Sequence, residues 1–135
     1  MDRLGAEKRS WNMSRIRSKN TAPEIRLRKY LYSRGMRYRI HAKLPGKPDI
    51  VISKRTAIFV NGCFWHSHAN CKRSALPKER HEWWKRKIEN NQLRDSKNYD
   101  LLKNLGWKVL IVWQCEISKT KIDNTIENLV KRITN

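Results

Sequence analysis

Acidic residues are scarce in this chain of 135 residues, because only 12 Asp and Glu stand against 31 Lys and Arg. The resulting formal net charge of +19 at pH 7 repels itself unless a polyanion lies against the protein, which makes nucleic acid the first partner to consider. A ribosomal-type protein, an RNA binder and a protein of an anionic membrane surface share this composition. Charge therefore favours a nucleic-acid role without separating binding from cutting.

Long apolar runs are also missing. No stretch approaches the roughly 20 residues of a membrane span, and the first ten residues, MDRLGAEKRS, lack the apolar segment of a secretory signal. With 39% hydrophobic residues, six tryptophans and only five glycines, the composition is that of a globular protein. We expect a cytoplasmic protein with one core and no membrane partner, associated with the nucleoid when it is on DNA.

Cysteine is limited to three residues, an odd number, and a reducing cytosol disfavours disulfides. Cys63, His68 and Cys71 form a C-x4-H-x2-C pattern, and Cys115, just past the last predicted strand, is a candidate fourth ligand. Tetrahedral Cys3His is a common closed zinc set, which would tie this loop to the last strand. The alternative is three thiols in the core and a histidine on the surface.

Apolar spacing and turn signals predict elements in the order α, β, β, β, α, β, α. The first helix begins at a capping box, Thr21-Ala-Pro-Glu24, and stops at Gly35. Strands are predicted over 37–41, 49–53, 56–60 and 107–113, with a helical stretch in one or two pieces from about 77 to 105 and a final amphipathic helix. The last strand, an almost continuous apolar run, is expected to be covered on both faces.

This order predicts one α/β domain over residues 21–135, with a mixed sheet flanked by helices on both sides and a helical crossover to the last strand. Strands 49–53 and 56–60 would form the central hairpin. Residues 1–20 are rich in basic side chains and poor in apolar ones, so we expect an N-terminal arm that binds DNA. Its basic residues are Arg3, Lys8, Arg9, Arg15, Arg17 and Lys19.

Asp49 follows Pro48 at the start of an apolar strand, where a divalent ion and a phosphate could meet at a sheet edge. Mg²⁺ usually takes only one or two protein carboxylates, so one aspartate there is chemically sufficient. The alternative is a turn aspartate that caps backbone amides.

His66 is left over from the predicted zinc set, and as a neutral imidazole it could take a proton from an attacking water. Asp95, on the long helical segment, could orient that imidazole by accepting its other N–H. Its ordinary state would be that of a solvated aspartate on a helix surface.

Phe64 and Trp65 are adjacent large aromatics in a loop otherwise full of polar groups. Exposed, they could wedge between base pairs, as apolar side chains do in DNA-bending proteins. Buried, they would belong to the core. Trp83 and Trp84 raise the same question.

Five segments together carry a resemblance to a known family: RSKNT (17–21), PE (23–24), LPGKPD (44–49), FVNGCFWHSH (59–68) and LGWKVLIVWQCE (105–116). Over nearly its whole length the chain resembles the very short patch repair (Vsr) endonucleases, which nick DNA beside a T:G mismatch. The resemblance implies a restriction-endonuclease-like core, related to the PD-(D/E)XK nucleases but with a histidine added to the active site.

The resemblance also implies roles for individual residues. Asp49 would bind Mg²⁺ with the backbone carbonyl near Val60 as a further ligand, and Glu24 would act through metal-bound water. His66 would be the general base and Asp95 its partner. The structural zinc would take Cys63, His68, Cys71 and Cys115, and the residues intercalating beside the mismatch would be Met13, Phe64 and Trp65.

Two departures from the family pattern stand out. Asn61 occupies the place of a histidine that is thought to assist catalysis in some members, which implies a slower reaction or a greater dependence on His66. The interval from His68 to Cys71 also varies within the family.

We therefore expect a monomeric, Mg²⁺-dependent endonuclease that nicks one strand of double-stranded DNA beside a T:G mismatch, with mismatch-repair proteins as candidate partners. One alternative is a restriction-type endonuclease that cuts matched DNA. The other is a zinc-stabilised DNA-binding module without catalysis.

Overall fold

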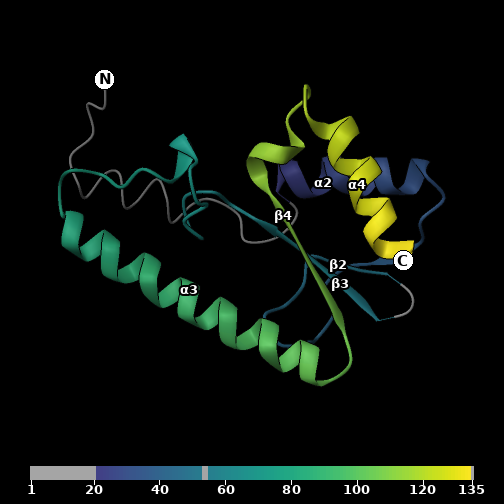
Figure 1. Cartoon of the computed structure of the whole chain (residues 1–135), viewed down its shortest axis with the longest axis horizontal. Coiled ribbons are helices and arrows are strands. Elements are labelled where there is room, and N and C mark those ends of the chain that lie inside the picture. The colour runs from purple at the N-terminus through teal and green to yellow at the C-terminus, as the bar shows by residue number, and fades with distance from the viewer. Residues whose placement is uncertain (1–20, 53–54, 135) are drawn as a thin grey trace.

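The structure is a computed structural model that describes residues 21–52 and 55–134. The predicted basic arm, with Met13, Arg15, Arg17 and Lys19, lies outside the described residues. Within them (Figure 1), the elements follow the order α2 (Ala22–Ser33), β1 (Tyr38–Arg39), β2 (Ile50–Ile52), β3 (Thr56–Asn61), η1 (Lys72–Ser74), α3 (His81–Asn104), β4 (Lys108–Trp113), η2 (Gln114–Ile117) and α4 (Ile122–Thr134). The two η elements are short 3-10 helices.

The four strands form one mixed sheet in the order β1-β2-β3-β4. β2 and β3 pair antiparallel, which confirms the central hairpin, and β1 pairs antiparallel with β2. β3 and β4 pair in parallel from Thr56↔Lys108 to Asn61↔Trp113. Because parallel neighbours need a crossover, α3 makes the connection that the sequence predicts.

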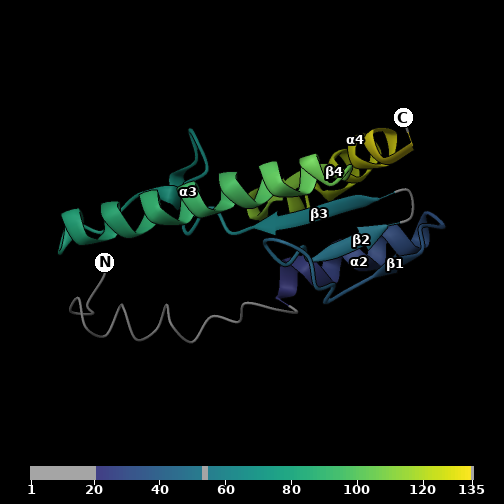
Figure 2. The same cartoon turned by 90° about the horizontal axis from the view of Figure 1, so that it is seen from below.

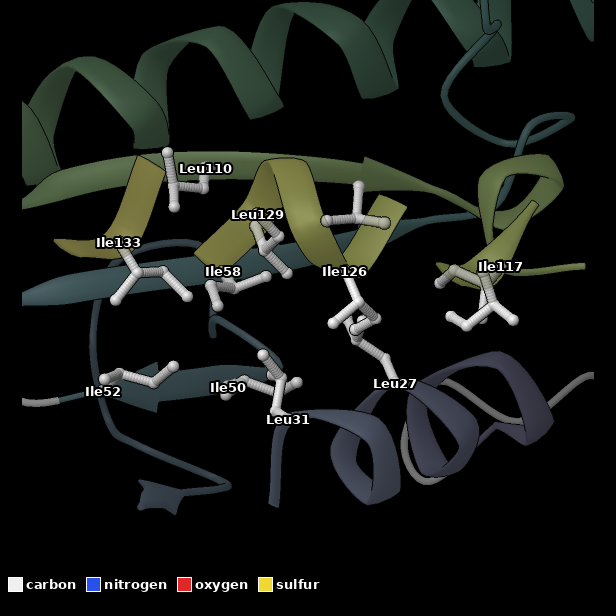
Figure 3. Packing of buried hydrophobic residues seen from close by; sticks show 12 residues of the cluster. Leu27, Leu31, Ile50, Ile52, Ile58, Leu110, Ile117, Ile126, Leu129 and Ile133 are labelled. Carbon is white, nitrogen blue, oxygen red and sulfur yellow. The ribbon is translucent and has the colours of Figure 1, made fainter. Parts of the chain in front are cut away.

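The helices lie on both faces of the sheet, with α3 on one side and α2 and α4 on the other (Figure 1). Successive side chains of β3 point to opposite faces of the sheet, so this strand contributes to both cores. Ile58 packs toward α2 and α4, whereas Ala57 and Phe59 pack toward α3. Figure 3 shows the larger core, where side chains of the two helices point toward β2 and β3. Its labelled members are Leu27, Leu31, Ile50, Ile52, Ile58, Leu110, Ile117, Ile126, Leu129 and Ile133.

The predicted helix ends are confirmed at three places. The Thr21 hydroxyl accepts from the backbone N–H of Glu24 at the start of α2. After α2, Gly35 adopts φ +78°, and the N–H groups of Gly35 and Met36 return to the carbonyls of Tyr32 and Leu31. This Schellman arrangement recurs at Gly106, with φ +88°, and ends α3.

Two predicted boundaries are wrong. The long helix is one piece and begins at His81, not near 77, because Arg80 has φ +55° and a left-handed residue cannot continue a right-handed helix. The first strand shrinks to Tyr38–Arg39, since His41 turns the chain with φ +59°. β4 is covered on both faces, as predicted: Leu110 and Val112 belong to the larger core, and Val109 packs against the smaller core beside α3.

The apolar side chains along α3 and at its end divide between the core and the surface. Trp84, Ile88 and Leu102 are buried, whereas Trp83, Leu101 and Leu105 are exposed.

Among the described residues, no helix has the length and hydropathy needed to cross a bilayer.

Thr56 provides a test of this packing. It is 1% exposed, and its hydroxyl has no hydrogen-bond partner among the described residues. Thr56→Val removes a desolvated polar atom at nearly constant shape, so we expect the free energy of unfolding to rise by about 1 kcal/mol in urea titrations. Thr125→Val is the matched control and should lower it by about 1 kcal/mol, because that hydroxyl donates to the Glu116 carbonyl. Equal effects of both variants would contradict this reading.

Candidate active site and metal centre

A groove of about 1960 Å³ opens where β3 ends. Figure 2 shows the N-terminal half of α3 extending past the end of this strand. The groove is lined by most of the predicted catalytic and DNA-contacting side chains: Glu24, Asp49, Val60, Phe64, Trp65, His66 and Asp95. Residues from α2, the β2–β3 hairpin, the following loop and α3 therefore face one space.

Asp49 is fixed by the hairpin it precedes. Its backbone N–H donates to the Ile58 carbonyl at 3.0 Å, and its Oδ2 accepts from the Val60 N–H at 2.6 Å. The N–H and C=O of one strand residue point to the same side, so the Val60 carbonyl is also directed toward Asp49. The aspartate thus caps a backbone amide and faces the groove at once.

Glu24 is the second acid of this corner. It lies in the first turn of α2, is only 6% exposed and shares a side-chain hydrogen bond with Asp49. Burial raises the pKa of Asp49 to about 7, and the charge of Glu24 raises it further. The Val60 hydrogen bond and the charge of Arg28 lower the pKa. Two carboxylates in contact and a main-chain carbonyl form the hard oxygen set that Mg²⁺ prefers.

His66 and Asp95 meet on the other side of the groove. The backbone N–H of His66 donates to the Gly62 carbonyl at 3.2 Å, and this turn brings the imidazole Nδ1 into hydrogen-bond contact with Asp95 Oδ2. The side chains are 25% and 18% exposed. The alternative of a solvated surface aspartate is therefore wrong, and Nε2 is the nitrogen left for a water.

Asp95 belongs to the stripe of α3 that faces the sheet and the groove. Members of this stripe recur every three or four residues, as one helix face requires: Trp84, Ile88, Asn91, Asp95, Tyr99 and Leu102. Its middle is polar, and Asn91 donates to the Trp65 carbonyl at 3.2 Å. Polar residues in the inward-facing stripe of a helix are the sequence signal of a site.

The two halves of the groove are held together by the turn at Gly46. This glycine has φ +76°, and a Cβ there would lie 3.0 Å from Cβ of Asn98 and 3.2 Å from the Phe59 ring. The turn leading to Asp49 therefore packs directly on α3, which carries Asp95.

Phe64 and Trp65 are neither fully exposed nor part of the core. Both are half-buried, and their ring centroids lie 5.5 and 5.9 Å from that of the buried Trp84. Trp83 remains 40% exposed, with the Arg80 guanidinium 4.4 Å over its ring. The start of α3 thus forms an aromatic wall at one end of the groove.

The predicted zinc ligands come together. One ligand atom from each of Cys63, His68, Cys71 and Cys115 lies within 4.8 Å of the others, and Cys115 Sγ is 3.4 Å from His68 Nδ1. With Zn–S near 2.3 Å and Zn–N near 2.0 Å, ligand atoms of a tetrahedron lie about 3.5–3.8 Å apart. The four side chains therefore fit a tetrahedral metal.

The metal cluster is braced by its surroundings. The His68 ring stacks on Trp113 with centroids 4.2 Å apart and an interplanar angle of 10°. Burial raises the pKa of the Cys115 thiol to about 11, whereas a hydrogen bond from the Arg73 backbone lowers that of Cys71. A bound cation would favour the thiolate at both positions.

Two residues of the site, Arg28 and Tyr99, were not predicted from the sequence. Arg28 lies one helical turn after Glu24 and lines the groove, so the i, i+4 spacing on α2 was an available signal. Tyr99 follows Asp95 at the same spacing on α3. Its ring makes no core contact that a phenylalanine would not make.

Removing a ligand of the metal cluster tests its role. Cys115→Ala should lower both the bound zinc per chain and the melting temperature, because it opens the link between the loop and β4. Metal analysis of the purified protein and thermal unfolding would be compared with Ser118→Ala, which lies nearby outside the cluster. Unchanged zinc stoichiometry would remove Cys115 from the site.

The raised pKa of Asp49 predicts a pH dependence of stability. The folded pKa of about 7 exceeds the unfolded value of about 3.9, so the folded state binds more protons between them. This stabilisation is complete below about pH 4 and is lost as pH rises through 7. Without divalent ions, Asp49→Asn should therefore gain melting temperature relative to wild type from pH 4 to 7 and hold that gain above it.

At pH 8, Mg²⁺ should raise the melting temperature of wild type above that of Asp49→Asn, because the ion stabilises ionised Asp49 and not the amide. Asp100→Asn, an exposed acid on α3, is the control. A difference in melting temperature between Asp49→Asn and wild type that does not change with pH would contradict the raised pKa of Asp49.

Comparisons with known proteins agree with these features. The model of the family "DNA mismatch endonuclease Vsr" matches residues 1–73. The type II nicking enzyme V.XorIIP of Xanthomonas oryzae pv. oryzae is 50% identical over 119 residues, covering 87% of each chain. V.NmeAIP of Neisseria meningitidis, also a type II nicking enzyme, is 42% identical over 135 residues, covering 98% of this chain and 96% of its own.

The DNA mismatch endonuclease Vsr of Escherichia coli is 44% identical over 111 residues, covering 81% of this chain and 70% of its own. The family model spans more than half of this chain, and each of these relatives covers well over two thirds of it. The resemblance seen in the sequence is thereby confirmed: the chain belongs to the Vsr family of DNA mismatch endonucleases and is a nuclease.

Proposed function

We propose that this protein nicks one strand of double-stranded DNA beside a T:G mismatch in a Mg²⁺-dependent reaction of very short patch repair. One observation carries the proposal: the acid pair of Glu24 and Asp49 and the pair of His66 and Asp95 line the same groove. An oxygen-rich cation site opposite an oriented imidazole is the arrangement that phosphodiester hydrolysis needs.

In this proposal, the side chains divide the reaction between them. Asp49 and the Val60 carbonyl would hold Mg²⁺, with Glu24 acting on it through water; the ion when bound polarises the phosphate and stabilises the leaving oxygen. His66 Nε2 accepts a proton from the attacking water, whose oxygen forms the new bond to phosphorus as the bond to the leaving oxygen breaks. Asp95 holds Nδ1–H and so favours the imidazolium that results.

Basic side chains around the groove would provide most of the affinity. Those that line it are Arg28, Lys43, Lys47, Lys87 and Arg94, and we assign the same role to Arg15, Arg17 and Lys19 of the N-terminal arm. Phosphate contacts of this kind release counterions, so binding should weaken steeply with salt.

Phe64 and Trp65 would supply the selectivity for the mismatch, with Met13 of the arm. Both aromatic side chains line the groove and are backed by Trp84, so they form a supported wedge. A wobble pair costs less to unstack than a matched pair, which favours insertion at T:G.

The cysteine cluster has a structural role in this account, with Zn²⁺ as its metal, because four protein ligands leave no open position for a substrate. Residues 21–135 would form the endonuclease domain, with a core related to the PD-(D/E)XK nucleases. We expect it to act as a monomer, since one nick needs one centre, in the cytoplasm where its DNA substrate lies.

A nicking assay tests the proposal. End-labelled duplexes that differ only in T:G against C:G would be incubated with wild type, His66→Ala or His81→Ala, with Mg²⁺ or with EDTA. We expect a nick confined to the T-containing strand, absent in EDTA, and slowed at least about 100-fold in His66→Ala, the usual effect of losing a general base. His81, exposed at the start of α3, should be dispensable.

Three outcomes would contradict the proposal. Equal cutting of both duplexes would indicate a restriction-type nuclease, full activity in EDTA would exclude Mg²⁺, and full activity of His66→Ala would remove the base. None of these outcomes would change the assignment of the chain to the Vsr family.

A further inference from the structure

Tyr99 lies one helical turn after Asp95, on the face of α3 that packs on the sheet. Its ring meets the buried ring of Phe59 edge to face, with centroids 4.9 Å apart. A phenylalanine would make the same contact, so ring packing does not explain the hydroxyl.

The hydroxyl contacts the end of the central strand. It accepts a hydrogen bond from Nδ2 of Asn61 at 2.9 Å. Asn61 is the last residue of β3, is 4% exposed and lines the groove. Its amide oxygen, Oδ1, has no hydrogen-bond partner within residues 21–52 and 55–134. An amide held by its nitrogen presents its oxygen in the other direction, and the groove is the open space beside it.

The catalytic acids also act on this hydroxyl. Burial raises the pKa of the Tyr99 phenol, the Asn61 hydrogen bond opposes this, and the charges of Asp95 and Asp49 raise it further. Tyr99 therefore lies within the field of both halves of the site. The phenol therefore stays protonated at neutral pH, and its oxygen accepts from the Asn61 amide.

We propose that Tyr99 is a positioning residue of the nuclease centre and acts through Asn61. The Tyr99 hydroxyl fixes the amide so that Asn61 Oδ1 accepts one hydrogen of the attacking water, while His66 Nε2 takes the other. Two acceptors on one water leave a lone pair of its oxygen free to face phosphorus. Asn61 exchanges no proton in this step; the proton lost by water goes to His66.

This inference rests on the proposed function, because it assumes a water directed by His66. Asn61 precedes Gly62, whose carbonyl accepts from the His66 N–H. The side chains of Asn61 and His66 also hydrogen-bond to two residues one turn apart on α3, Tyr99 and Asp95.

The test uses Tyr99→Phe, which keeps the ring and removes only the hydroxyl, with Tyr38→Phe as the matched control on the opposite core. We expect Tyr99→Phe to lower kcat about tenfold, the effect of one lost hydrogen bond, with KM for DNA and melting temperature unchanged. Asn61→Ala should lose at least as much. If Tyr99 acts through Asn61, adding Tyr99→Phe to Asn61→Ala should cost nothing more.

Losses that multiply in the double variant would overturn the proposal, as would a change in KM alone. The rates are measured on whichever mismatched duplex wild type nicks fastest. A preference other than T:G, or an active His66→Ala, would therefore count against the proposed function and leave the comparison of Tyr99 with Asn61 readable.

A measurement without turnover supports or overturns the same point. In Tyr99→Phe, the side-chain amide resonances of Asn61 should shift and their hydrogens should exchange faster with solvent, whereas Tyr38→Phe should change neither. Unaltered Asn61 resonances in Tyr99→Phe would show that the hydroxyl does not hold the amide.

Discussion

The parallel pairing of β3 with β4 is the constraint on which both functional clusters depend. Its register sets Asn61 opposite Trp113, so the chain leaves both strands at the same edge of the sheet. Two residues further on, Cys63 and Cys115 lie close enough to share a metal. Because parallel strands need a long crossover, the same pairing requires α3, and α3 carries Asp95 to His66. A slip of the register would separate the metal ligands and alter the groove together.

The site is costly for the fold. Asp49 is held in contact with Glu24 where burial opposes the charge of Asp49, a state that a cation relieves. Left-handed residues other than glycine gather in the surrounding loops: His41, Lys47, Ser67, Asn70 and Arg80. Each such conformation costs about 1–2 kcal/mol and persists only where neighbouring structure enforces it. Ser67 and Asn70 lie between the ligands of the metal cluster, which gives that cluster a direct part in holding the loop beside the active groove.

Much of the architecture could be predicted from local signals. Gly35 and Gly106 ended helices as expected, because only a residue tolerant of positive φ closes a Schellman turn, and the hairpin and crossover followed from element order. The four metal ligands could be grouped because their chemistry is specific, although Cys115 is remote in sequence.

The helix start at His81 was missed, because nothing in the composition of 77–80 reveals that Arg80 is left-handed. Tyr99 was missed for another reason: its role depends on which face of α3 meets the sheet and the groove, which tertiary packing decides. Arg28 was predictable, because its i, i+4 spacing from Glu24 is a local signal. The half-buried state of Phe64 and Trp65 likewise depends on Trp84, a contact that periodicity does not show.

In our proposal, a divalent cation held at Asp49, beside Glu24, faces His66 across one groove. Mn²⁺, which favours the same oxygen ligands as Mg²⁺, broadens the proton resonances of nearby side chains, so an NMR titration measures the claim directly. The imidazole signals of His66 should broaden at about one Mn²⁺ per chain and those of His81 far less, because 14 residues of α3 separate His81 from Asp95, about 21 Å of helix. Asp49→Asn should abolish the difference. Equal broadening of both histidines, or selective broadening of His66 that survives in Asp49→Asn, would contradict the account.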